Sequence, residues 1–178
     1  DDYVGQAFGV SGSDIFRRAL DSDAESDTAL LGLPRNPTAL EFESFQFDTL
    51  FGWDANALVR IGLSNADSAV VADVSAPVSN VGEQWTGLAY DHTNGVAVGV
   101  ANTGLVAEVD LTNGSLSTQS TLTPAWQAVA VHPSTGRVYA VAPDGGNGAD
   151  LYRLDRVGGG WQALLLGNLD GVVRGRSE

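Results

Sequence analysis

Residues 85–100 read WTGLAYDHTNGVAVGV, and residues 126–141 read WQAVAVHPSTGRVYAV. The two segments align without a gap at a spacing of 41 residues, so that Trp85 matches Trp126. Each segment has a short apolar run, a turn rich in Asn, Ser, Thr and Gly, and a second apolar run. This order predicts a β-hairpin. Its recurrence indicates a fold built from internal repeats.

Two more strands are expected after each hairpin, so that a repeat has four strands, lettered a to d from the inside outward. In the third repeat these are LVAEVDL (105–111) and LSTQSTL (116–122), and the Asn-Gly between them is a strong hairpin signal. In the fourth repeat they are LYRLDRV (151–157) and WQALLLG (161–167), separated by three glycines.

Two earlier copies of the pattern precede these repeats. The second repeat is predicted to contain strands at 39–45, 49–54, 57–63 and 68–74. The first repeat supplies only strands b, c and d, at 7–10, 14–20 and 27–33. A segment with the character of the missing strand a, GVVRG, lies at the other end of the chain, at 171–175.

The spacing of the b strands defines the predicted fold class. Their centres, at Gly9, Gly52, Gly99 and Ala140, are 41 to 47 residues apart, which is typical of four-stranded propeller blades. We therefore predict an all-β protein, a β-propeller of four four-stranded antiparallel repeats. It is either a closed four-bladed ring or part of a larger or two-chain ring.

The whole chain, 1–178, is then one β-propeller domain. Its approximate repeats are 1–35, 36–79, 80–124 and 125–170, with 171–175 as the candidate closing strand a.

The repeats also resemble a known group of proteins. AYDHTNGVAVGV and AVHPSTGRVYAV, each leading to a strand such as LVAEVDLTNG or LYRLDRVGGG, resemble the YVTN and quinoprotein-like β-propeller repeats of secreted or surface bacterial proteins. The resemblance implies the propeller fold. It permits binding and surface modules as well as lactonases and cofactor enzymes.

Composition narrows the location and the partners. Nine basic residues face 22 acidic ones, which gives a formal charge of -13, so nucleic acid and anionic lipid surfaces are disfavoured partners. No apolar run approaches the roughly 20 residues needed to cross a bilayer. The chain has neither Cys nor Met, which excludes thiol chemistry and indicates a processed or excised piece. These features favour an extracellular or cell-surface protein.

Candidate ligand sites are few. Asp144, Asn147 and Asp150 lie among three glycines in the expected b-to-c loop, where their oxygens suit Ca²⁺. The same residues are also ordinary in a long turn. Trp85 and Trp126 either stack on a flat ligand at the mouth of the channel or pack between neighbouring blades.

Catalytic signals are missing from the sequence. His92 and His132 lie in equivalent turns, where turn polarity accounts for them, and none of the GxSxG, HExxH, P-loop or GxGxxG motifs is present. We therefore predict a non-catalytic extracellular or cell-surface scaffold or binding module. It self-assembles through terminal strand exchange or binds a surface protein or glycan, and needs no cofactor. The alternative is a secreted propeller enzyme or cofactor binder, lactonase-like or quinoprotein-like, with a site at the channel mouth and Ca²⁺ near Asp144.

Overall fold

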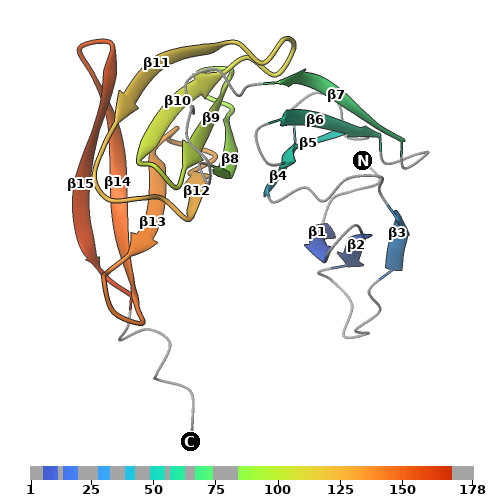
Figure 1. Cartoon of the computed structure of the whole chain (residues 1–178), viewed down its shortest axis with the longest axis horizontal. Helices are drawn as coiled ribbons and strands as arrows, with labels where there is room; N and C mark the ends of the chain where they lie inside the picture. The colour runs from blue at the N-terminus through green and yellow to red at the C-terminus, as the bar shows by residue number, and fades with distance from the viewer. Residues whose placement is uncertain are drawn as a thin grey trace, which may run out of the picture.

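The chain forms four antiparallel sheets, each a simple meander (Figure 1). The computed structural model describes residues 6–11, 14–19, 28–32, 39–42, 49–54, 57–62, 67–73 and 84–169, with side chains at 49–54, 57–62 and 84–169. Within these ranges no helix is long and apolar enough to cross a membrane.

The strands follow one another in chain order within each sheet. The first sheet contains β1 (Gln6–Ser11), β2 (Asp14–Ala19) and β3 (Thr28–Gly32). The second contains β4 (Ala39–Phe42), β5 (Thr49–Asp54), β6 (Ala57–Gly62) and β7 (Asp67–Asp73). The third contains β8 (Trp85–Asp91), β9 (Val96–Ala101), β10 (Leu105–Val109) and β11 (Leu116–Thr121). The fourth contains β12 (Ala128–Val131), β13 (Val138–Pro143), β14 (Ala149–Val157) and β15 (Gly160–Asn168).

These elements confirm the predicted strands, including the three-stranded first repeat. Apolar runs and glycine-containing turns fix the hairpins β8–β9, β10–β11 and β12–β13 locally, and Gly95, Gly114 and Gly136 all adopt positive φ in these turns. The candidate closing strand at 171–175 lies outside the described residues.

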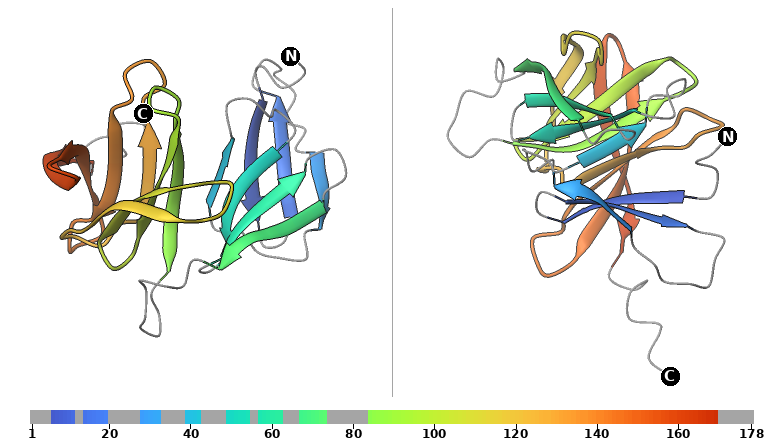
Figure 2. Two further views of the ribbon diagram at one scale, coloured as in Figure 1. Left: turned by 90° about the horizontal axis from the view of Figure 1, so that it is seen from above. Right: turned by 90° about the vertical axis from the view of Figure 1, so that its right-hand side faces the viewer.

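The four sheets are arranged as an open arc rather than a closed ring in the part of the chain that the structure describes (Figure 1). Seen from above, the third and fourth sheets stand together on one side and the first and second on the other (Figure 2). The inner strands β4, β8 and β12 pack against one another in succession, and the outer strands β11 and β15 also meet. A closed four-bladed ring is therefore not what these strands form.

The core lies between neighbouring sheets. Between the second and third sheets, the indoles of Trp53 and Trp85 stack with centroids 4.6 Å apart and an angle of 11° between the rings. Between the third and fourth sheets, β9 and β10 pack against β13 and β14 through buried side chains: Val98, Val100, Val106, Val138, Ala140 and Leu154. The second, third and fourth sheets thus pack face to face in succession, as blades of a propeller do.

Small residues on the inner strands allow this close packing. A Cβ on Gly87 would lie 2.9 Å from the backbone nitrogen of Val129 in the next sheet. Because this nitrogen belongs to the backbone, it cannot move away as the end of a side chain could. Glycine at this position therefore sets how closely β8 and β12 approach.

Candidate functional site

The predicted calcium loop joins β13 to β14. Asp144 Oδ1 accepts hydrogen bonds from the backbone N–H groups of Gly146 (2.7 Å) and Gly148 (3.2 Å). Asn168, on β15, places its Nδ2 3.1 Å from Asp144 Oδ2 and 3.1 Å from Asp150 Oδ1. The structure therefore brings Asp144 and Asp150 together through Asn168, whereas Asn147 lies exposed in the loop.

Sequence reasoning missed Asn168, although a signal for it was present. The tight turn between β14 and β15 pairs Val157 with Gly160, and the ladder that starts there ends by pairing Asp150 with Asn168. Counting the cross-strand pairs from the glycine turn, and allowing for one β-bulge, leads to the pair of Asp150 and Asn168. The bulge is what the sequence did not show.

Chemically, this cluster offers two carboxylates and one amide. The amide nitrogen and oxygen of an asparagine exchange places by a half-turn of the side chain, so Asn168 can face the carboxylates with a donor or with a third hard oxygen. In the described residues, His, Asp and Glu do not gather in threes as a ready metal cage. The cluster is thus a partial oxygen site that needs further ligands to hold a cation.

A second polar region lies at one end of the third sheet, where the turns after β8 and β10 share the pattern Asp-x-Thr-Asn-Gly. Asp91 Oδ1 accepts from the N–H of Thr93 at 3.0 Å, and Asp110 Oδ1 accepts from the N–H of Thr112 at 2.8 Å. The asparagine in each turn donates to the other carboxylate oxygen, at 2.7 Å and 2.9 Å. The two aspartates are therefore turn-forming groups.

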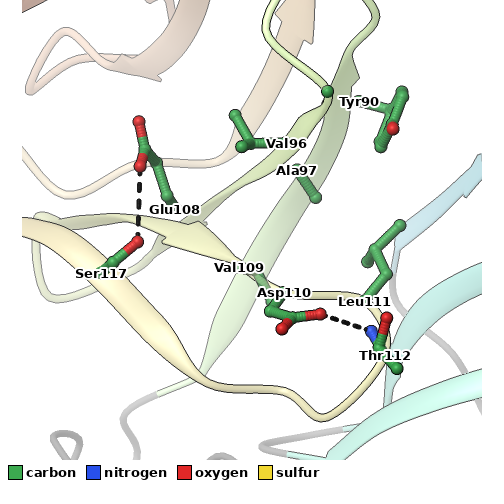
Figure 3. A pocket seen from close by; sticks show the side chains of 10 residues that line it. Tyr90, Val96, Ala97, Glu108, Val109, Asp110, Leu111, Thr112 and Ser117 are labelled. Atoms are coloured by element: carbon green, nitrogen blue, oxygen red, sulfur yellow. Dashed lines mark hydrogen bonds between the residues drawn. The ribbon is translucent and has the colours of Figure 1, made fainter.

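Between these turns is a hollow of about 270 Å³ (Figure 3). Its carboxylates are already engaged: Asp110 accepts from its own turn, and Glu108 Oε2 accepts from the hydroxyls of Thr118 (2.7 Å) and Ser117 (3.4 Å). The rest of the wall includes Tyr90 and Leu111. With its carboxylates bonded, the hollow offers a surface for contact rather than a free base for chemistry.

One charged group ties the third sheet to the fourth. Arg156, on β14, donates through Nε to Glu108 Oε1 at 2.6 Å and through Nη1 to Asp91 Oδ2 at 3.0 Å. Its guanidinium also lies 4.8 Å from the ring centre of Trp161. The Asp91 side chain is fully buried and that of Arg156 is 30% exposed, so the ion pair crosses the sheet boundary with its carboxylate buried and its guanidinium partly open to solvent.

The surroundings of Asp91 favour its ionised form. Burial alone would raise the pKa of this carboxyl, but hydrogen bonds from Asn94 and Arg156 outweigh burial and hold the pKa below its ordinary value of 3.8. The carboxylate therefore stays charged wherever the protein is folded near neutral pH.

Both tryptophans predicted as ligand contacts are buried, each 1% exposed. Trp126 donates from Nε1 to the carbonyl oxygen of Gly104 at 3.0 Å, in the third sheet. Trp85 stacks on Trp53. Of the two placements that the sequence left open, the structure has the packing between sheets. Neither indole has an exposed face on which a ligand could stack.

The histidines close turns, as their sequence positions suggested. His92 makes an edge contact with Tyr90, with ring centres 5.0 Å apart. His132 lies 3.3 Å from the hydroxyl of Ser134 within a single exposed turn. Both contacts are local to the turns.

Comparison with known proteins defines the fold. The sequence matches no protein-family model and none of the curated proteins. Solved structures do match in shape. The β-propeller domain of Cps50 (Swd1) from Myceliophteria thermophila has a TM-score of 0.52 at 14% identity over 74% of this chain. A structural-genomics protein of unknown function from Bacteroides thetaiotaomicron has a TM-score of 0.59 at 9% identity over 89%.

A calcium-binding protein, regucalcin, from Agrobacterium tumefaciens has a TM-score of 0.57 at 17% identity over 79% of this chain. The matches extend over 39%, 40% and 50% of the Swd1, Bacteroides and regucalcin chains, so this chain spans about half of their length or less. At these identities the likeness shows a β-propeller fold and nothing about activity.

Proposed function

We propose that this chain is a non-catalytic β-propeller scaffold, extracellular or on the cell surface, that completes its ring by strand exchange. The observation that carries the proposal is the unequal strand count. The first sheet has three described strands, with β1 at its edge, whereas the other three sheets have four.

The missing position is that of the inner strand. In the complete sheets this place is taken by β4, β8 and β12, which form the inner row. Among the described residues no strand pairs with the outer side of β1, and an unpaired strand edge is a template for strand addition. GVVRG at 171–175 has the apolar character to fill it, from the same chain or another.

Composition supports the location and the partner class. A chain with a formal charge of -13 and neither Cys nor Met suits an oxidising exterior. The engaged carboxylates around the 270 Å³ hollow favour contact over catalysis. A surface protein or glycan is the external partner we propose.

Two truncations test the strand exchange. Removal of 171–178 should lower the melting temperature and change the particle mass, because it deletes the proposed strand. Removal of 176–178 alone, which keeps 171–175, is the matched control and should change neither. If both truncated chains melt and assemble like the full chain, the strand-exchange proposal is refuted.

A second candidate function, a Ca²⁺-binding propeller, rests on the cluster of Asp144, Asp150 and Asn168. One of the similar structures is also a calcium-binding protein. Calorimetric titration with Ca²⁺ should show binding that Asn168→Ala abolishes and Asn147→Ala leaves intact. No heat with the unaltered chain, and no stabilisation in excess Ca²⁺, would discard this candidate.

A further inference from the structure

The hollow at the end of the third sheet is lined by a mixture of aromatic, hydroxyl and carboxylate groups. β8 supplies Tyr90, β10 supplies Glu108, β11 supplies Ser117, and the turn between β10 and β11 supplies Asp110 and Thr112 (Figure 3). Its volume of about 270 Å³ is just under the roughly 300 Å³ at which pockets for drug-sized ligands begin. The hollow therefore suits a single ring of a ligand.

Comparison of the repeats separates residues that a blade needs from residues that only this hollow has. When the sheets are aligned on the centres of their b strands, the second, third and fourth sheets have Arg60, Glu108 and Arg153 at one position. At another position, Tyr90 of the third sheet is matched by Val131 of the fourth. The carboxylate and the phenol of the third sheet are therefore not requirements of the repeat.

Tyr90 presents an aromatic ring and a hydroxyl group at the hollow. The residue is half-buried, and His92 packs edge-on against it with ring centres 5.0 Å apart, which restricts its rotation. The Tyr90 hydroxyl makes no hydrogen bond with the described residues. The ring can therefore pack against C–H groups of a ligand, while its hydroxyl remains available to a polar group of the same ligand.

Asp110 keeps acceptor capacity after its own hydrogen bonds. Its Oδ1 accepts from the N–H of Thr112 and its Oδ2 from Nδ2 of Asn113. Because an ionised carboxylate has about four lone-pair sites, each oxygen can accept one more hydrogen bond. Hydrogen bonds from hydroxyl groups to a carboxylate are short and charge-assisted, so Asp110 is a strong acceptor for the hydroxyl groups of a ligand.

The charges at the hollow favour a neutral ligand. Glu108 is paired with Arg156 at 2.6 Å, whereas Asp110 has no cationic partner among the described residues. This carboxylate and the formal chain charge of -13 repel anions. A single exposed carboxylate also holds a cation only weakly in water. The surroundings are therefore best matched by an uncharged ligand that carries several hydroxyl groups and an apolar C–H face.

We propose that this hollow binds one ring of a neutral saccharide. The C–H face of the sugar packs on Tyr90, and its hydroxyl groups donate to Asp110 and accept from Thr112. The inference rests on the proposed function, in which a surface protein or a glycan is the external partner, and commits to the glycan. It does not depend on how the ring closes, because every group that contacts the sugar belongs to the third sheet and its turns.

A glycan array that displays neutral, sialylated and sulfated chains tests the ligand class. We expect the labelled protein to bind a subset of the neutral glycans and none of the anionic ones. Calorimetric titration with the neutral glycan of strongest signal, and with choline as a cationic probe, then measures the affinities. Failure to bind any neutral glycan above background, or tighter binding of choline, overturns the inference.

Three variants locate the binding. Tyr90→Phe should weaken it about 3- to 10-fold without changing the melting temperature, because the lost hydroxyl has no partner in the described residues. Asp110→Asn keeps an oxygen for the turn and should weaken binding about 10-fold. Tyr139→Phe, at a half-buried tyrosine of the fourth sheet, is the matched control and should leave the affinity unchanged. Equal affinities for all three variants overturn the inference.

The truncation separates this inference from the proposed strand exchange. A chain without 171–178 that melts and assembles like the full chain, and still binds the neutral glycan, refutes strand exchange and retains the saccharide site. A chain that loses stability on that removal, and whose full-length form binds no neutral glycan, retains strand exchange and overturns the saccharide site.

Discussion

The guanidinium of Arg156 lies 3.0 Å from the buried carboxylate of Asp91, across the boundary between the third and fourth sheets. The same guanidinium reaches Glu108, so one cation joins two strands of the neighbouring sheet. This contact adds a charge pair to a boundary that buried apolar side chains and the hydrogen bond from the Trp161 N–H to Ser120 Oγ also hold together. Its loss therefore tests how the sheets are joined.

Asp91→Asn should lower the free energy of unfolding by about 2 kcal/mol, because it removes the charged acceptor of a hydrogen bond from Arg156, which still reaches Glu108. Glu108→Gln should cost less, about 1 kcal/mol, since Glu108 is partly exposed and glutamine can still accept. Urea unfolding of the three chains measures both losses. Equal losses would contradict the assigned role of burial.

The pH dependence of the Asp91 contribution has a definite sign. Its pKa is depressed below 3.8 in the fold, so its stabilisation is complete above that pH and is lost as pH falls through the folded pKa. The stability advantage of the unaltered chain over Asp91→Asn should therefore shrink between about pH 4 and pH 2. An advantage that stays constant over this range would contradict the depressed pKa.

Gly104 and Gly145 have nearly the same φ, so alanine substitutions at the two positions separate backbone strain from steric clash. Gly104 and Gly145 have φ of +87° and +85°, but a Cβ on Gly104 would lie 1.8 Å from the carbonyl oxygen of Leu122, whereas a Cβ on Gly145 meets nothing. Gly145→Ala should cost about 1 kcal/mol from backbone strain alone. Gly104→Ala should cost at least about 3 kcal/mol. Thermal unfolding of the two variants compares them directly.

The buried tryptophans Trp126 and Trp161 should respond differently to loss of the indole N–H group. Trp126 donates to Gly104, whereas Trp161 Nε1 is buried without a hydrogen-bond partner in the described part of the chain. Trp126→Phe should therefore destabilise by about 1 kcal/mol more than Trp161→Phe. A larger loss at Trp161 would show that its contact with Arg156 dominates.

The two Asp-x-Thr-Asn-Gly turns should differ in the cost of losing asparagine. Asn94 donates to the buried Asp91 and Asn113 to the exposed Asp110. Asn94→Ala should cost about 2 kcal/mol, since it removes a donor from a buried charge, and Asn113→Ala less than about 1 kcal/mol. Denaturant midpoints measured side by side decide this.

The hairpins were predictable because their determinants are local. Asn94-Gly95 and Asn113-Gly114 fix turns through their own backbone and side chains, and the apolar runs beside them alternate or stay continuous as sheets require. The three-stranded first sheet followed from the same counting. These are interactions within a dozen residues of sequence.

Contacts between sheets could not be predicted in the same way. The partners Arg156 and Asp91 are 65 residues apart, and their meeting depends on how two sheets stack. The choice of Asn168 over Asn147 depended on a bulge in β14 and β15. The sequence left two placements open for Trp85 and Trp126, stacking on a ligand or packing between blades. The way the sheets stack decides between them, because it buries both indoles.

The central claim is that strand exchange fills the inner position of the first sheet. The melting temperature and the light-scattering mass of the full chain and of the chain without 171–178, measured at several concentrations, test it most directly. The account predicts a lower melting temperature and a changed particle mass for the shortened chain. Equal melting temperatures and equal masses for the two chains, at every concentration, would contradict it.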